Sequence, residues 1–173
     1  MIALYRGISP ISRAIRFFTW SDYSHASYVR DDRSLEIESW HKGGVRERSV
    51  LGEGHPPCTK IDLFRINASS DQVRLIEGFL RSQVGKGYDY RGVVHFISRR
   101  DEELRGQERW FCSELVFAAH AHAGIHLLAR VPAWKVSPGL LSMSPLLDYI
   151  GSRWTTAAPV TWPKSSQTEG VSQ

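Results

Sequence analysis

The sequence predicts an α+β domain in which an antiparallel sheet packs against a helix that begins near Cys112. Short apolar or alternating segments, separated by tight turns, are typical of antiparallel strands. Two longer segments, after Ser69 and after Cys112, carry apolar residues at helical spacing. A length of 173 residues fits one domain. We assign this domain to residues 1–154 and expect residues 155–173, rich in Ser and Thr, to form a flexible polar tail.

The expected strands are residues 2–6, 25–30, 33–40, 44–50 and 59–66. Gly7 and Pro10 punctuate the chain after the first strand, which indicates a turn. Asp31 and Asp32 are typical of a two-residue hairpin loop between the second and third strands. The alternation along the second strand then puts His25 and Ser27 on one face of the sheet.

The expected helices are residues 11–18, the segment from Ser69 to Gly85, residues 112–123 and a last helix from Ser137 through Ile150. Ser69 and Gln72 have the spacing of a capping box. Ser137 followed by proline is typical of an N-cap and the first helical position. In residues 11–18, Arg13 and Arg16 lie opposite an apolar stripe, a pattern more typical of a core-facing helix than of a membrane-bound one.

Charge and composition exclude several classes of protein. A net charge of +4 and a pI near 9.3 would suit nucleic acid. However, acidic residues interrupt the densest basic stretch, residues 99–109, so no nucleic-acid partner is expected. No apolar run reaches the roughly 18 residues that span a membrane, and residues 1–10 lack the features of a secretory signal. We therefore expect a cytoplasmic protein with two free thiols.

Cys112 is the candidate nucleophile because it stands at the expected start of a helix. The helix macrodipole and the free backbone N–H groups at this position stabilise a thiolate. The same N–H groups can bind an oxyanion on an attacked carbonyl. Cys58 lies in a Pro-Pro loop and is interpreted as a bystander.

His25 is the candidate base, and the expected register of the hairpin indicates which carboxylate lies next to it. With a two-residue loop, opposed residues of the second and third strands have numbers that sum to 63, which places His25 opposite Glu38. Their Cβ atoms would lie about 5 Å apart on the same face. Glu38 would then fix the tautomer of the imidazole and leave its other nitrogen for the thiol. Glu36 lies two residues before Glu38, so its side chain is expected on the same face, and it is the alternative partner of His25.

The other histidines give weaker predictions. His41 and His55 fall in expected loops. His122 and His126 are four residues apart, but no glutamate accompanies them as in a zinc-binding H-E-x-x-H helix, and Gly124 lies between them. We therefore expect no metal and no cofactor.

Four motifs, YSHASYV, LEIESW, YDYRGV and WFCSELV, occur in this order. They resemble the circularly permuted NlpC-type, papain-like cysteine hydrolases of the YiiX-like kind and, more distantly, lecithin retinol acyltransferase. The resemblance covers residues 2–150 and implies a papain-like fold. It also implies that Cys112 is the nucleophile, His25 the base and Glu38 the third polar residue. The segment ALYRG resembles the first strand of the family but lacks an acidic residue near its start.

The resemblance implies cleavage or transfer of an acyl group of an amide or ester through a thioester. Relatives use cell-wall peptides and acyl lipids. It also places Tyr5, Tyr23, Tyr88 and Tyr90 near the substrate. Two alternatives stay open: a binding module that keeps the fold without turnover, and a lipid acyltransferase in which residues 11–18 contact a membrane surface.

Overall fold

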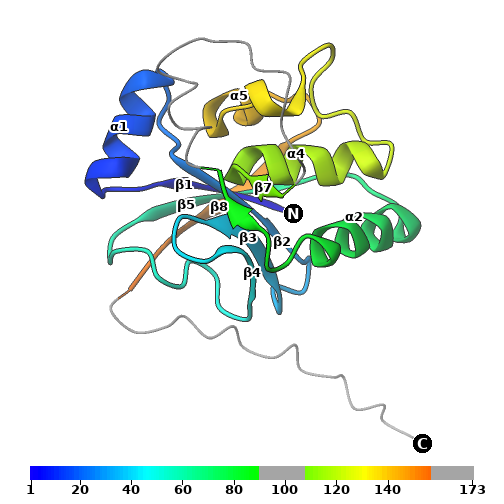
Figure 1. Ribbon diagram of the computed structural model, residues 1–173, viewed down its shortest axis with the longest axis horizontal. Helices are drawn as coiled ribbons and strands as arrows, with labels where there is room; N and C mark the ends of the chain where they lie inside the picture. Colours follow the sequence, from blue (N-terminus) through cyan, green and yellow to red (C-terminus); the bar gives the residue numbers. More distant parts are fainter. Residues whose placement is uncertain (90–107, 157–173) are drawn as a thin grey trace, which may run out of the picture.

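The computed structural model describes residues 1–89 and 108–156, which form an antiparallel sheet with helices packed against it (Figure 1). The strands of the sheet lie in the order β4-β3-β2-β1-β5-β8. Their bounds are β1 Ile2–Arg6, β2 His25–Val29, β3 Glu36–Trp40, β4 Gly44–Arg48, β5 Lys60–Arg65 and β8 Asp148–Trp154. Two further strands, β6 (Gly87–Tyr88) and β7 (Arg109–Trp110), form a short parallel pair.

The helices are α1 Pro10–Phe18, α2 Ser70–Ser82, α4 Cys112–His122, α5 Pro138–Ser142 and the 3₁₀ helix η1 Ala133–Lys135. Ser69 and Gln72 form the predicted capping box at the start of α2. Ser137 caps α5 by accepting a hydrogen bond from the Leu140 N–H. The α+β class and the packing of the sheet against the helix that begins at Cys112 are confirmed.

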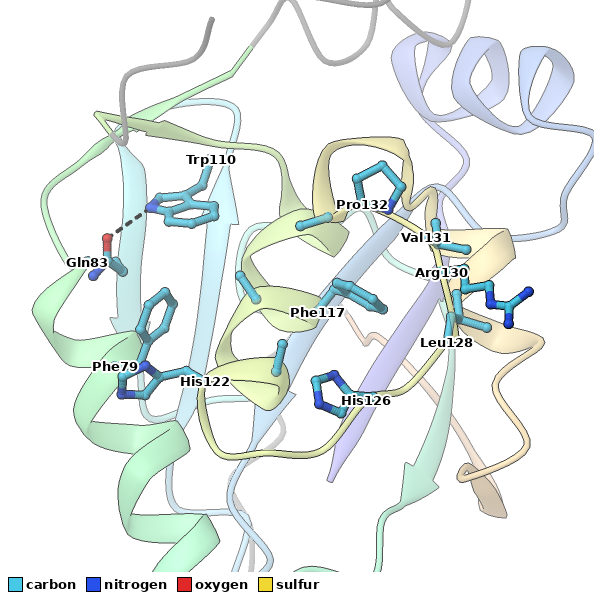
Figure 2. Close-up of a pocket in the computed structure, with 13 residues that line it drawn as sticks. Phe79, Gln83, Trp110, Phe117, His122, His126, Leu128, Arg130, Val131 and Pro132 are labelled. Atoms are coloured by element: carbon cyan, nitrogen blue, oxygen red, sulfur yellow. Dashed lines mark hydrogen bonds between the residues drawn. The ribbon is translucent and has the colours of Figure 1, made fainter. Parts of the chain in front are cut away.

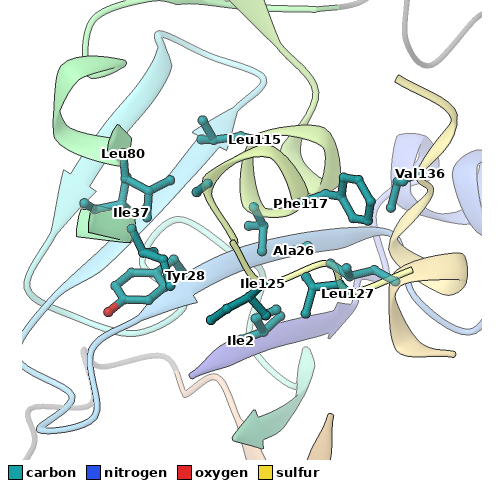
Figure 3. Close-up of a cluster of buried hydrophobic side chains, with 14 of the residues drawn as sticks. Ile2, Ala26, Tyr28, Ile37, Leu80, Leu115, Phe117, Ile125, Leu127 and Val136 are labelled. Atoms are coloured by element: carbon teal, nitrogen blue, oxygen red, sulfur yellow. The ribbon is translucent and has the colours of Figure 1, made fainter. Parts of the chain in front are cut away.

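The two faces of the sheet bury different clusters because side chains alternate along each strand. The face toward α2 and α4 holds the larger cluster, whose members in Figure 3 include Ile2, Ala26, Tyr28, Ile37 and Leu115. The opposite face holds a smaller cluster that includes Tyr5 and Val29. His25 has the parity of Val29 along β2, so its side chain leaves the sheet on the face opposite α4.

The register of β2 and β3 differs from the prediction by two residues. Ser27 pairs with Glu38 and Val29 with Glu36, so opposed numbers sum to 65 rather than 63. The loop between the strands is longer than the predicted two residues because Arg33 N–H donates back to the Arg30 carbonyl. A slip of two residues keeps every side chain on its predicted face.

The prediction of a last helix from Ser137 through Ile150 is wrong beyond its first turn. Helix α5 ends at Ser142, and Ile150 lies in β8, which pairs with β5 at the edge of the sheet. A strand pairing with residues 60–65 is a non-local interaction that a local apolar spacing does not reveal. Thr155, the first residue assigned to the tail, is buried and accepts a hydrogen bond from the Thr59 N–H at 2.9 Å.

Helix α1 is less buried than predicted. Ile15 is its one buried residue, whereas Ile11, Phe17 and Phe18 are exposed. A core-facing helix would cover its whole apolar stripe, so that expectation is wrong for most of α1. None of the described helices is long and apolar enough to cross a membrane.

Candidate functional site

His25 and Glu38 are in direct contact. Nε2 of His25 lies 2.6 Å from Oε2 of Glu38, and both side chains are buried. The two residues sit diagonally across the β2–β3 ladder, since Glu38 faces Ser27. Their side chains lie on the same face of the sheet, as predicted from the alternation along the strands, and this brings them into contact.

Arg46 holds the other oxygen of Glu38. Its Nε lies 2.8 Å and its Nη2 2.6 Å from Oε1. Arg46 faces Glu38 directly across the β3–β4 ladder, and its guanidinium stacks 4.3 Å from the centre of the Trp40 ring. Both guanidinium nitrogens thus converge on one carboxylate oxygen, which leaves Oε2 for His25.

Burial determines the protonation of this pair. It lowers the pKa of His25 to about 3, with further lowering from the positive charge of Arg46. Burial raises the pKa of Glu38 to about 6, although Arg46 acts against this rise. At neutral pH the imidazole is therefore neutral and Glu38 is a carboxylate. The Nε2–H then donates to Glu38, which leaves the lone pair on Nδ1, the form required of a general base.

Cys112 is the first residue of α4 and is 1% exposed. It belongs to a small buried cluster with Ile15, Tyr88 and Phe111. The backbone N–H groups of Ala26 and Ser113 donate to it. Ala26 directly follows His25, so this hydrogen bond ties the start of α4 to the start of β2.

The sulfur reaches β2 where the β2–β3 ladder ends. Val29 N–H donates to Met1 on the β1 side and Arg30 N–H donates to Leu35 on the β3 side. The N–H of Ala26 has the parity of Arg30 and so also points toward β3. The β2–β3 ladder stops at Ser27 and Glu38, and there this N–H bonds to Cys112 instead.

Cys112 and His25 therefore approach the same end of β2 from opposite faces of the sheet. Cys112 belongs to the α4 side, and His25 lies on the side of Tyr5. Within residues 1–89 and 108–156, no hydrogen bond joins the Cys112 sulfur to the His25 ring.

The thiol is not poised as a thiolate. Burial raises the pKa of Cys112 to about 12, and the N–H donors of Ala26 and Ser113 offset only part of this rise. The expected lowering by the helix terminus is therefore overturned by desolvation, which is the larger effect for a fully buried group.

Tyr5 and Glu36 form a second buried pair beneath the site. The Tyr5 hydroxyl donates to Glu36, which also accepts from the Gly52 N–H at 2.9 Å. The Tyr5 ring meets His25 edge-on at 5.1 Å. Glu36 is thus bonded away from His25. Tyr5, predicted to contact substrate, is fully buried and supports the site instead.

The other predicted residues fall in different places. Tyr88 packs beside Cys112. Tyr23 donates to Asp62 at 2.9 Å and lines a cavity of about 770 Å³ between α1 and α5. Tyr90 lies outside the described residues. Cys58 is exposed and unbridged.

Two residues of the site, Arg46 and His55, were not predicted from the sequence. Arg46 is predictable in principle, because a hairpin turn after Trp40 places it opposite Glu38. His55 comes from the loop after β4, and its ring lies 5.2 Å from that of His25. No periodic pattern marks a loop residue that folds back on a sheet. With His25 and Glu38, it forms the one group of potential metal ligands found among the described residues.

A separate cavity of about 670 Å³ lies between α2, α4 and the loop after α4 (Figure 2). Its walls include Phe79, Phe117 and Trp110, whose indole N–H donates to Gln83 at 3.1 Å. Cys112, His25 and Glu38 do not line this cavity.

No family model and no curated protein matches the sequence. Among solved structures, the metalloprotein YiiX from Escherichia coli O157:H7 is similar, with a TM-score of 0.65 and 20% sequence identity. The match covers 89% of this chain and 96% of that one. The fold is therefore YiiX-like, as the sequence motifs predicted.

Proposed function

We propose that the protein is a cysteine-dependent hydrolase that cleaves an amide or ester through a thioester on Cys112. One observation carries the proposal: the Cys112 sulfur is hydrogen-bonded to Ala26, next to a histidine whose Nε2 is held by a clamped glutamate. A nucleophile, a base and an orienting carboxylate are the components of a catalytic triad. The motif resemblance assigns the same three residues.

The reaction balances with these groups alone. Nδ1 of His25 takes the thiol proton, directly or through one water, as the Cys112 sulfur attacks the carbonyl carbon. The N–H groups at the start of α4 stabilise the oxyanion. The C–N or C–O bond then breaks, and the leaving group takes the proton from His25. Water, deprotonated by His25, cleaves the thioester and releases the acid and the thiol.

The buried thiol determines when this proton moves. With a pKa near 12, Cys112 stays protonated in the free enzyme. The proposal therefore requires proton transfer to coincide with attack on bound substrate. Glu38 supports this step because a carboxylate beside Nε2 stabilises the imidazolium that forms.

YiiX is named a metalloprotein, so the residues here must be tested for a metal. Nε2 of His55 is buried without a hydrogen-bond partner among the described residues. It lies with His25 and Glu38 in a group of nitrogen and oxygen donors that suits Zn²⁺. The residues fit such an ion, which when bound supplies Lewis-acid chemistry.

Ester and amide turnover by purified variants tests the hydrolase proposal. We expect wild type to hydrolyse members of a panel of 4-nitrophenyl esters and peptide amides, with zinc removed by chelator. Cys112→Ala should abolish this activity, and Cys58→Ala, at an exposed cysteine, should keep it. Equal activity of wild type and Cys112→Ala would overturn the proposal. Absence of turnover in wild type would instead favour the binding module.

A second candidate function, acyl transfer at a lipid surface, is favoured by the surface around α1. Phe17 is 68% exposed, Trp20 88% and Met143 72%. Arg13 and Arg16 lie on the same helix. Exposed aromatic and apolar residues beside arginines are typical of segments that bind anionic bilayers.

Sedimentation with anionic phosphatidylglycerol vesicles tests this second candidate. Binding by wild type should fall on Trp20→Ser and on joint neutralisation of Arg13 and Arg16 to Gln. Trp154→Ser, at an exposed tryptophan of β8, is the matched control. Absence of vesicle binding by wild type, or equal loss in the control, would contradict a surface role.

A further inference from the structure

We propose that His25, Glu38 and His55 form a binding site for one Zn²⁺ ion. One ligand atom from each residue lies within 4.8 Å of the others. Two histidines and one glutamate are an established donor set for zinc, with the fourth position left to water. The three residues come from β2, β3 and the loop after β4, so the folded chain assembles the site.

His55 gives the clearest indication of a missing ligand. Its Nε2 atom is buried and has no hydrogen-bond partner in the described part of the chain. A buried polar atom without a partner is costly, and an ion or a water bonded to it is the usual explanation. Imidazole nitrogen is a preferred ligand for Zn²⁺.

The His55 ring is held in place for this role. It stacks on Tyr5 with ring centres 4.4 Å apart and planes 9° apart, and meets Trp40 edge-on at 4.7 Å. The backbone N–H of His55 donates to the Gly52 carbonyl at 3.1 Å. A ligand fixed by packing loses little entropy when it binds a metal.

Glu38 offers one oxygen to the ion. Arg46 occupies Oε1, which leaves Oε2, the atom now bonded to His25. Binding of Zn²⁺ to these two atoms would displace the proton that lies between them to Nδ1 of the neutral imidazole, with no net release of a proton to solvent. The charge of Arg46 opposes the ion, so we expect weaker binding than the same three ligands would give without a neighbouring cation.

Zinc binding and the proposed hydrolysis use the same two residues. A His25 nitrogen and Glu38 oxygen bound to Zn²⁺ cannot orient and carry a proton for Cys112. The regulatory part of the inference, that zinc inhibits turnover, therefore rests on the proposed function. The binding part does not, because it involves neither Cys112 nor the substrate.

Titration of the full chain with Co²⁺, followed by visible absorption, and with Zn²⁺, followed by calorimetry, tests the site. Wild type should bind one ion, and His55→Phe, which keeps the stacked ring and removes both nitrogens, should weaken binding by more than about 100-fold. His126→Gln, at an exposed histidine, should leave the affinity unchanged. Circular dichroism verifies that each variant is folded.

Separate outcomes distinguish this inference from the hydrolase proposal. Cys112→Ala should keep wild-type zinc affinity while losing turnover. Absence of a 1:1 complex in wild type, or wild-type affinity in folded His55→Phe, would overturn the zinc site. Loss of binding in His126→Gln would assign the ion to His126, in the loop after α4, and also overturn it.

Discussion

Nε2 of His25 lies 2.6 Å from Oε2 of Glu38, although the two residues do not face each other across the β2–β3 ladder. Glu38 faces Ser27 on one side and Arg46 on the other. Arg46 holds one carboxylate oxygen and turns the second toward His25. Side chains from β2, β3 and β4 thus act together to orient one imidazole.

Removal of the base should reduce activity strongly. We expect His25→Ala to lower kcat/KM by about 100- to 10,000-fold, the usual contribution of general acid–base catalysis. Glu38→Gln should lower it by a comparable factor, because Arg46 holds the amide oxygen and the NH2 group then faces Nε2, which moves the imidazole proton to Nδ1. Steady-state kinetics with zinc removed provides the measurement. Wild-type kcat/KM in folded His25→Ala would exclude His25 as the base.

Arg46 should contribute to stability more than a surface arginine. Arg46→Met leaves the buried Glu38 carboxylate without its cation, which typically costs about 3–5 kcal/mol. The matched control is Arg81→Met, since Arg81 pairs with Glu47 at 3.4 Å where both side chains are largely exposed. Such a pair contributes about 0–1 kcal/mol. Equal free energies of unfolding in urea for the two variants would contradict a stabilising role of the buried Arg46–Glu38 pair.

The contact between His25 and Glu38 could be anticipated from sequence, because a shift of the strand register by two residues leaves each side chain on the same face of the sheet. The loop after β2 is longer than predicted, since Asp32 accepts from the Ser34 N–H at 2.9 Å and Arg33 adopts φ 61°. An odd slip would have moved Glu38 to the other face. The contact was therefore predictable, and its diagonal geometry was not.

Burial and non-local contacts could not be read from the sequence. The start of α4 at Cys112 was predictable from local pattern, but the desolvation that raises the pKa of its thiol depends on Ile15 and Tyr88, which are distant in sequence. The approach of His55 depends on a loop path without periodicity. Strand β8 depends on pairing with β5.

Glu36 should make the protein less stable as pH rises. Burial, with the nearby Glu38 charge, raises its pKa from 4.5 to about 8. Between these values the folded protein keeps a proton that the unfolded chain has released, so the free energy of unfolding falls with increasing pH. Above pH 6.5 the lowered pKa of His25 no longer opposes this trend.

Comparison with Glu36→Gln isolates that effect. The buried N-terminal amino group has a lowered pKa and stabilises with increasing pH up to 8, but it is common to both proteins. Urea unfolding at pH 6.5 and pH 8 should show wild type losing stability relative to Glu36→Gln. A constant difference between the two proteins over this range would contradict a protonated Glu36.

The two thiols should differ in reactivity in the free enzyme. Cys58 is exposed, whereas Cys112 is buried with a pKa raised to about 12. Alkylation by iodoacetamide at pH 8, followed by peptide mapping, should modify Cys58 first. Faster modification of Cys112 would show a thiolate already present at rest and contradict proton transfer that waits for substrate.

Trapping of the acyl-enzyme tests the central claim most directly. Wild type is mixed with a 4-nitrophenyl ester that it hydrolyses, quenched in acid within the first turnover and digested for mass spectrometry. We expect the acyl mass on the peptide that contains Cys112, lost on treatment with hydroxylamine as a thioester should be. Turnover without this adduct, with Cys112 unmodified throughout or the acyl group on another residue, would contradict Cys112 as the nucleophile.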